Sequence, residues 1–221
     1  MNKTRRQLLK TSLLGGAAVA AGVTPDVSES MQGSAASAKP LSILILGGTG
    51  FIGPHMVREA LRRGHTVELF NRGRTNNELF PDLKLYRGDR DGGLDALQGG
   101  SWDVVIDNSG YVPRHVADSA RLLAPAVSHY LYISTISVYG DFSRPIDEDT
   151  ALATIDDETN EEVTGETYGP LKALCEHRVL TEFGTDATTI LRPTYICGPG
   201  DRTDRYTYWP VRTMRGGNML W

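Results

Sequence analysis

Short apolar runs alternate with longer amphipathic stretches along most of the chain. The runs predict buried strands at Leu41–Leu46, Thr66–Phe70, Leu83–Tyr86, Asp103–Ile106, Tyr130–Ser134 and Ala187–Leu191. The stretches between them predict helices at Phe51–Arg63, Val112–Ala124 and Tyr168–Phe183. Gly64 follows the first helix and Pro125 the second, as expected for residues that end helices. This alternation predicts an α/β protein with a doubly wound parallel sheet and helices on both faces.

Residues 1–38 have the features of an export signal. Four basic residues precede an apolar run at Leu13–Val23, whose 11 residues are too few to span a bilayer as a helix. The segment TRRQLLK, with Arg5 and Arg6, resembles the twin-arginine export motif, and Ala36–Ala38 has the small-x-small pattern of a cleavage site. We therefore predict a twin-arginine signal peptide at 1–38, export by the twin-arginine machinery, and a folded domain at 39–221. A general secretory signal and an uncleaved membrane anchor remain as alternatives.

The segment GGTGFIG directly follows the first strand and opens the first helix. Its glycines at 47, 50 and 53 allow a tight turn and a close approach of the backbone to a pyrophosphate. The helix N-terminus offers free amide donors to that anion. We therefore predict a dinucleotide site formed here by Gly47, Gly48, Thr49, Gly50, Phe51, Ile52 and Gly53.

Residues after the next strands extend this site. The acid that usually bonds the adenosine ribose is absent after the second strand, where the chain reads Asn71-Arg72. An asparagine can bond a ribose hydroxyl and an arginine can neutralise a 2′-phosphate, so NADP is slightly favoured over NAD, with both left open. Asp89 is expected to accept from the adenine amino group. Asn108 and Ser109 are expected along the bound dinucleotide.

Candidate catalytic groups follow the fifth strand and open the third helix. Tyr168 and Lys172 are four residues apart, so a helix places both on one face. A tyrosine hydroxyl is a weak acid, and a nearby ammonium stabilises its ionised form. Ser134 and Thr135, in YISTISVYG, stand where a hydroxyl can steady a carbonyl or alkoxide oxygen.

Taken in order, GGTGFIG, the GD after the third strand, ISTISVYG, YGPLK and RPTYICGPGD resemble motifs of the extended short-chain dehydrogenases, the NAD-dependent epimerase/dehydratase family. The resemblance implies a Rossmann-type fold and action on a sugar, nucleotide sugar or related hydroxyl compound. It implies a catalytic set of Thr135, Tyr168 and Lys172, in which Tyr168 moves a proton during hydride transfer. Ser134, Tyr168 and Lys172 would also contact the cofactor, and Arg192–Ile196 would line its nicotinamide end.

The sequence departs from this family in three places. Ile136 and Ser137 replace the Asp-Glu pair of sugar dehydratases, so 4,6-dehydration is not expected. The missing acid after the second strand resembles less typical members, some of them reductases and some RNA-binding or scaffold proteins. The chain ends 20 residues after Asp201, whereas the family continues into a substrate domain. We therefore expect an incomplete C-terminus and slow or absent turnover, with a non-catalytic NAD(P)-binding module as the alternative to an epimerase or reductase.

The net charge and the cysteine content indicate which partners and sites are not expected. The net charge of −4 argues against a nucleic-acid partner. Cys175 and Cys197 lack CxxC spacing, so no metal site is expected, and two buried free thiols are favoured over a disulfide. Residues 141–167 carry ten acids and one base, which fits either a solvated connection or a rim of the substrate site. A homodimer stays open.

Overall fold

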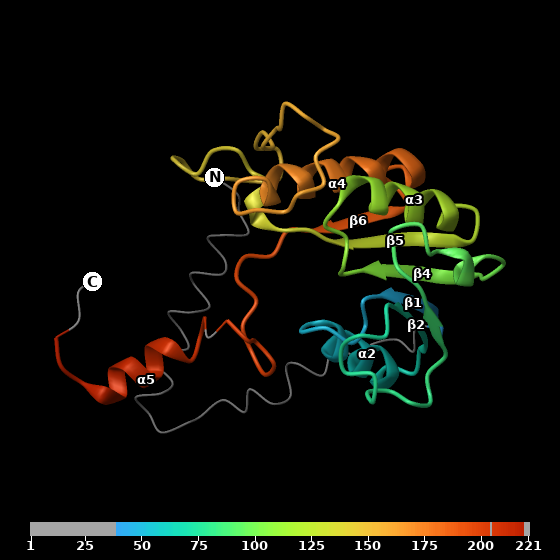
Figure 1. Ribbon diagram of the computed structural model, residues 1–221, viewed down its shortest axis with the longest axis horizontal. Coiled ribbons are helices and arrows are strands. Elements are labelled where there is room, and N and C mark those ends of the chain that lie inside the picture. The colour runs from blue at the N-terminus through green and yellow to red at the C-terminus, as the bar shows by residue number, and fades with distance from the viewer. Residues whose placement is uncertain (1–38, 204, 219–221) are drawn as a thin grey trace, which may run out of the picture. The chain divides into compact units, whose positions relative to one another are not determined.

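The computed structural model describes residues 39–203 and 205–218, so the predicted signal peptide lies outside the described residues. In the described part, six strands form one parallel sheet in the order β3-β2-β1-β4-β5-β6 (Figure 1). The strands are β1 (Ser42–Leu46), β2 (Thr66–Asn71), β3 (Leu85–Arg87), β4 (Trp102–Asp107), β5 (Val127–Ile133) and β6 (Thr188–Leu191). This is the doubly wound parallel sheet that the sequence predicts.

The helices cover the sheet from both sides. Helix α2 (Gly53–Arg62) lies on one face, and α3 (Pro113–Leu123) and α4 (Tyr168–Phe183) lie together on the other (Figure 1). Short 3-10 turns occur at Asp95–Leu97 (η1) and Ile136–Val138 (η2), and α5 (Tyr208–Arg215) follows the last strand. The sequence analysis anticipated none of these last three elements, because each is short or lacks an apolar face.

The alternation of side chains in β1 explains the two layers. Ile43 and Ile45 pack with Val57 of α2, whereas Leu44 and Leu46 pack with Val116 of α3 and its neighbours. Leu44, Ile45 and Leu46 have no exposed surface. A parallel strand covered on both faces is expected to be apolar at every position, as LSILIL is.

The order of the strands fixes where a ligand can bind. β1 lies between β2 and β4, and the chain leaves β1 toward α2 on one face but leaves β4 toward α3 on the other. The connections after β1 and β4 therefore diverge at the carboxyl ends of these two strands, which opens a crevice there.

Strands β3 and β5 begin at other residues than predicted, because pairing with the neighbouring strand sets their limits. β5 begins at Val127 rather than Tyr130, because Val127 pairs with Trp102 of β4. It ends at Ile133, so Ser134 lies in the loop and not in the strand. β3 begins at Leu85 rather than Leu83, since its pairing with β2 starts only there.

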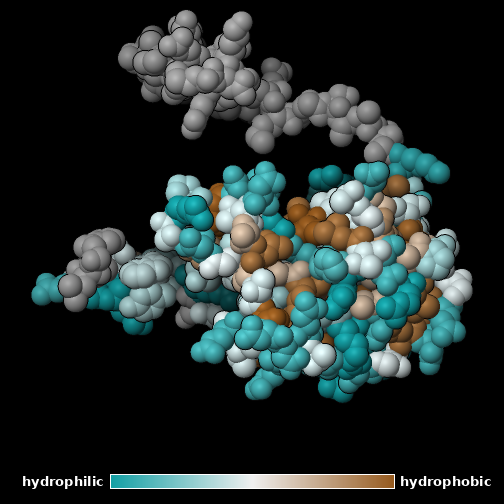
Figure 2. All heavy atoms as spheres, turned by 90° about the horizontal axis from the view of Figure 1, so that it is seen from above, coloured by the Kyte–Doolittle hydropathy of each residue, from teal (hydrophilic) through white to brown (hydrophobic). Residues whose placement is uncertain are grey.

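The surface is mostly hydrophilic but is broken by hydrophobic patches (Figure 2). Large exposed side chains include Tyr111, Phe142 and Tyr195, and all three line a cleft. None of the helices in the described part of the chain is both long and apolar enough to cross a membrane.

Candidate active site

The glycine loop is fixed by two close backbone approaches. Gly47 has φ +91°, which favours glycine, and its amide donates to the Phe70 carbonyl at 2.9 Å. An ideal Cβ on Gly53 would lie 2.5 Å from the Gly47 carbonyl oxygen and 2.6 Å from the Gly48 carbonyl carbon. Gly53 therefore lets the first turn of α2 pack directly against the loop.

The middle of the loop faces open space. A Cβ on Gly50 would meet nothing within 4 Å, and the first residue before α2, Ile52, makes no side-chain cap to the helix. The Gly53 amide at the start of α2 is left for an anion, whereas the His55 and Met56 amides donate to the Ile52 carbonyl at 3.2 and 3.3 Å. Gly48 behaves differently: a Cβ there would lie 2.6 Å from the Leu69 side chain, and Gly48 does not line the cleft. Its position against Leu69 of β2 explains why this residue is a glycine, and its contact with the cofactor stays a prediction.

The predicted adenosine end is assembled from the ends of β2, β3 and β4. Asn71, Arg72 and Asp89 line one cleft with the glycine loop. The Asn71 side-chain oxygen accepts from the Gly73 amide at 2.8 Å, and the Asp89 carbonyl accepts from the Gly93 amide at 2.9 Å. These bonds order the loops after β2 and β3. The turn that contains Asp89 sets the direction of its carboxylate.

The loop after β4 forms the floor beside the glycine loop. Asn108 and Ser109 both line the cleft. The Ser109 hydroxyl donates to the Leu46 carbonyl at 3.1 Å, which ties β4 to β1 at the switch point. A Cβ on Gly47 would collide with Asn108 at 2.4 Å, so the two loops touch.

Lys172 reaches the cleft from the first turn of α4. Its Nζ donates to the Gly110 carbonyl at 2.8 Å and to the Ile133 carbonyl at 2.7 Å. Only 3% of the residue is exposed, and this burial lowers the pKa of its ammonium to about 8, against the opposing effect of Asp107. Two of its three protons are engaged, which leaves the third for a group in the cleft.

The predicted hydroxyl groups lie around the same space. Tyr168 opens α4, and its ring centroid lies 6.3 Å from that of Tyr111. The Thr135 Oγ accepts from the Ser137 amide at 3.1 Å and so begins η2. The Ser134 Oγ is buried without a hydrogen-bond partner among the described residues. Because Ser134 also lines the cleft, this hydroxyl is available to a ligand there.

A single cleft of about 1050 Å³ joins these groups. Except for Gly48 and Arg192, the residues assigned to cofactor or catalysis from the sequence line it: Gly47, Thr49, Gly50, Phe51, Ile52, Gly53, Asn71, Arg72, Asp89, Asn108, Ser109, Ser134, Thr135, Tyr168 and Lys172. Its size and shape fit a dinucleotide laid across the sheet edge, with room at Gly50 and an unpartnered hydroxyl at Ser134.

Sequence reasoning missed several lining residues, of which Tyr111, Val112, His115 and Phe142 are examples. Tyr111 and Val112 directly follow the loop after β4, and the carboxyl-end rule for parallel sheets could have found them. Phe142 belongs to the acidic segment 141–167. The charged side chains of this segment form surface pairs such as Glu161 with Arg114. The segment therefore reaches the cleft at Phe142 and is otherwise largely exposed.

Two expectations are wrong in part. Arg192 does not line the cleft, because its guanidinium forms a bidentate pair with the buried Glu176 at 2.7 and 3.0 Å. Pro193–Ile196 do line it. Both cysteines are free, but only Cys175 is buried, whereas Cys197 is exposed.

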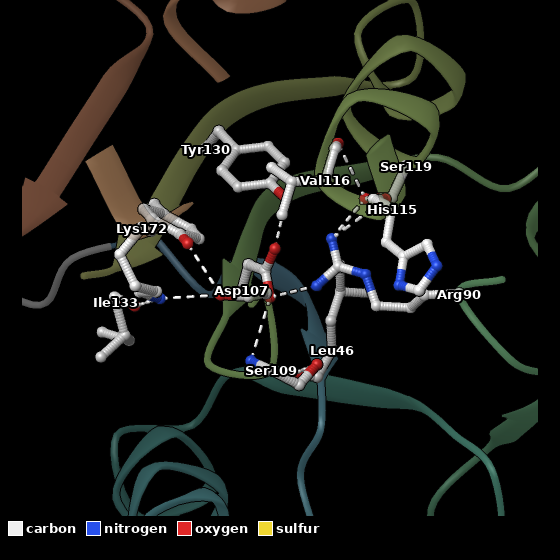
Figure 3. Close-up of polar contacts among 12 residues, drawn as sticks. Leu46, Arg90, Asp107, Ser109, His115, Val116, Ser119, Tyr130, Ile133 and Lys172 are labelled. Carbon is white, nitrogen blue, oxygen red and sulfur yellow. Dashed lines mark hydrogen bonds and ion pairs between the residues drawn. The ribbon is translucent and has the colours of Figure 1, made fainter. Parts of the chain in front are cut away.

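A buried ion pair joins Asp107 to Arg90, which lines the cleft (Figure 3). Arg90 and Asp107 are 2.6 Å apart, and neither side chain is more than 9% exposed. Burial opposes ionisation of Asp107, but Arg90 and the Tyr130 hydroxyl hold its pKa below the usual value. No sequence pattern marked this pair, since Arg90 and Asp107 are separated by 17 residues.

The strand order, the glycine loop and the cleft define a Rossmann-type α/β domain. Comparisons with known proteins agree with this fold. Residues 43–99 match the model of the NAD dependent epimerase/dehydratase family. A solved structure, MoeE5 in complex with UDP-glucuronic acid and NAD, superposes with a TM-score of 0.56 and 25% identity over 78% of this chain and 60% of that chain. The predicted Rossmann-type fold is thereby confirmed.

Two curated relatives are similar in sequence. The 2-alkyl-3-oxoalkanoate reductase of Stenotrophomonas maltophilia (strain K279a) is 30% identical over 186 residues, which are 73% of this chain and 53% of the relative. The chloroplast stem-loop binding protein of 41 kDa b of Arabidopsis thaliana is 32% identical over 184 residues, 75% of this chain and 44% of the relative. The chain thus spans about half the length of these relatives.

Proposed function

We propose that the whole chain belongs to the NAD-dependent epimerase/dehydratase family. It binds NAD or NADP and takes part in hydride transfer at a hydroxyl or carbonyl group. The observation that carries the proposal is the single cleft that joins the glycine loop to Thr135, Tyr168 and Lys172. The NAD complex of MoeE5, which shares the fold, supports the choice of cofactor.

The residues of the cleft fit a nicotinamide dinucleotide. The glycine loop and the α2 N-terminus would hold the pyrophosphate, with Gly50 giving it room. Asn71 and Arg72 would bind the adenosine ribose or its 2′-phosphate, and Asp89 the adenine amino group. Ser134 would donate its unpartnered hydroxyl near the nicotinamide end.

When bound, a nicotinamide supplies the position that accepts or donates a hydride. Tyr168 takes the proton of a substrate hydroxyl, or returns it to a carbonyl oxygen in the opposite direction. Thr135 hydrogen-bonds the same oxygen and steadies it. Lys172 places a positive charge beside Tyr168 and offers its third proton to a ribose hydroxyl. Tyr111, Val112 and Phe142 also line the cleft and would pack against a bound ligand.

The proposed substrate is a sugar or nucleotide sugar, with other hydroxyl or carbonyl compounds as the second choice. MoeE5 was solved with UDP-glucuronic acid, which favours the first, whereas the bacterial relative is named as a reductase of 2-alkyl-3-oxoalkanoates, which favours the second. A panel containing UDP-sugars and 3-oxoacids, read by absorbance of the reduced nicotinamide, separates them.

A second candidate function is binding without turnover. The relative from Arabidopsis thaliana is named for binding a stem-loop, and it shares 32% identity with this chain. Both candidates bind a dinucleotide, but only the first changes its redox state. Absorbance that stays constant across the panel, with dinucleotide bound tightly, would favour the second candidate. The absence of any dinucleotide binding in a calorimetric titration would contradict both.

We also propose export by the twin-arginine route. This route carries folded proteins, so a cofactor bound before transport would travel with the chain. Replacing Arg5 and Arg6 with lysine preserves the charge but removes the paired guanidinium groups, and cell fractionation should then find the precursor retained. Equal export of the lysine variant would instead indicate a general secretory signal.

A further inference from the structure

A buried carboxylate lies beneath the loop that receives Lys172 (Figure 3). Asp107, the last residue of β4, has no exposed surface. It accepts from the Tyr130 hydroxyl at 2.7 Å and from the Ser109 amide at 3.1 Å, and it pairs with Arg90 at 2.6 Å. Donors from β5, from the loop after β4 and from the loop after β3 therefore hold this carboxylate in one orientation.

The Ser109 amide connects Asp107 to Lys172. The next residue, Gly110, offers its carbonyl oxygen to both the Lys172 ammonium and the Tyr132 hydroxyl, each at 2.8 Å. An added Cβ on Gly110 would lie 2.9 Å from the Asp107 carboxylate, so the turn rests directly on that side chain. The position of the carbonyl that holds Lys172 thus depends on Asp107.

Ionisable groups surround Lys172, and their charge states decide which of them act on its ammonium. Burial raises the pKa of the Cys175 thiol to about 11 and that of the Tyr132 hydroxyl well above its usual value, so both are neutral. Glu176 is neutralised by Arg192 at 2.7 Å. The ionisable groups that act on or contact Lys172 are Asp107, Arg90, Tyr111, Tyr132, Cys175 and Glu176, and Tyr168 lines the same cleft.

Among these groups, Asp107 has the largest favourable effect on the charged form of Lys172. Arg90 acts in the opposite sense and more weakly. Arg90 is held in place by Asp107 and by the Ser119 hydroxyl, and through this pairing it allows the carboxylate to be buried in its charged form.

We propose that Asp107 is the positioning residue for Lys172: it fixes the Ser109–Gly110 turn that receives the ammonium, and it supplies the negative charge that keeps this ammonium protonated inside the domain. Asp107 touches neither substrate nor cofactor and acts through Lys172. The inference rests on the proposed function only for the role of Lys172 in turnover.

The test is the titration of Lys172 itself, followed by NMR of the full chain labelled at lysine Cε. The sequence has five lysines, and the Lys172 signal is identified by its loss in Lys172→Met. Asp107→Asn keeps the size of the side chain but leaves Arg90 as the nearest buried charge. We expect the Lys172 pKa to fall by about one unit or more, and the alkaline limb of turnover to move to lower pH with it.

Glu68→Gln is the matched control, because Glu68 is a partly buried carboxylate that also accepts from a tyrosine hydroxyl, that of Tyr86, and pairs with a cation, Lys84. It lies outside the cleft. This variant should lose stability without moving the Lys172 titration. An unchanged Lys172 pKa in folded Asp107→Asn, or an equal shift in Glu68→Gln, would overturn the proposal.

If Asp107→Asn does not fold, Arg90→Met combined with Asp107→Asn removes both buried charges together. Because Asp107 acts on Lys172 more strongly than Arg90 does, the pKa should still fall, by less than in the single variant. A pKa that rises or stays the same in this folded double variant contradicts the proposal. A wild-type chain that binds a dinucleotide without turnover would favour the second candidate function, whereas the Lys172 titration would still decide the role of Asp107.

Discussion

An ideal Cβ atom on Gly53 would lie 2.5 Å from the carbonyl oxygen of Gly47, closer than folded proteins allow between a side chain and backbone. Gly53→Ala must therefore push α2 away from the loop. We expect a loss of about 1–3 kcal/mol in the free energy of unfolding, the usual range for overpacking. Dinucleotide affinity should fall as well, and chemical denaturation with calorimetric titration measures both.

Gly50→Ala separates folding from binding at the same loop. A Cβ at Gly50 meets nothing within 4 Å and the residue has no positive φ, so the melting temperature should not change. The methyl group would occupy space needed by the pyrophosphate, so affinity should fall at least tenfold, or about 1.4 kcal/mol. Gly165→Ala, at an equally open position that does not line the cleft, is the control and should bind normally. Equal affinity of all three proteins would contradict the phosphate-loop assignment.

Tyr168→Phe should remove turnover and preserve the fold. If Tyr168 transfers the proton, the rate constant should fall by about 10²–10⁴ with little change in dinucleotide affinity. Tyr86→Phe loses a phenol hydroxyl away from the cleft, where it donates to Glu68, and should retain the rate. Turnover by Tyr168→Phe close to that of the unaltered protein would exclude Tyr168 as the acid and base.

The buried ammonium of Lys172 predicts how stability depends on pH. Its pKa is about 8 in the folded state, below the usual lysine value that applies when the chain is unfolded. Below pH 8 both states carry the proton, and the cost of burying the charge is fully present. As pH rises from about 8 toward 10.5, the folded state loses its proton first, so this cost falls.

The unfolding free energy of the protein should therefore rise relative to that of Lys172→Met across this window, by on the order of 3 kcal/mol in total. Denaturation series at pH 7, 8, 9 and 10 measure the difference between the two proteins. A constant difference would mean that Lys172 titrates normally in the folded state.

Glu176→Gln tests the assignment of Arg192 to the core. Glu176 is 2% exposed and forms both of its charge-assisted bonds with Arg192, whose side chain is 20% exposed. Removing the charge should destabilise the fold by about 2–4 kcal/mol, because the arginine loses its buried partner. Dinucleotide affinity should change little. A selective loss of affinity without loss of stability would return Arg192 to the binding site.

The sequence predicted most of the sheet because each strand contains a short apolar run, of which that in β1 is the most continuous. β1 reads SILIL, and such a run between a turn and a glycine loop has few alternatives. β3 was placed two residues early, since Leu83 and Lys84 also fit a strand and only pairing with β2 sets the limit. α5 was missed because its residues YWPVRTMR include a proline and none of them is buried.

The site was predictable where residues follow strands, and less so where folding joins distant segments. Tyr168 and Lys172 could be placed together from their spacing on one helix, and Thr135 from its place after β5; all three line the cleft, and their catalytic role stays a prediction. The Arg90–Asp107 pair and the Glu176–Arg192 pair were not predicted, because nothing in the spacing shows which charges meet in the core. Gly48 was assigned to the cofactor by its place in the loop, whereas its contact with Leu69 depends on how β2 packs.

The difference between the two thiols gives the protein a built-in attachment point for a probe. Cys175 is buried and its pKa is raised to about 11 by burial, which keeps it protonated and unreactive, whereas Cys197 is exposed. Cys197 directly follows Ile196, which lines the cleft. A maleimide dye should therefore attach at one place without any mutation, close enough to the nicotinamide end to sense a ligand by fluorescence while leaving every proposed binding residue untouched.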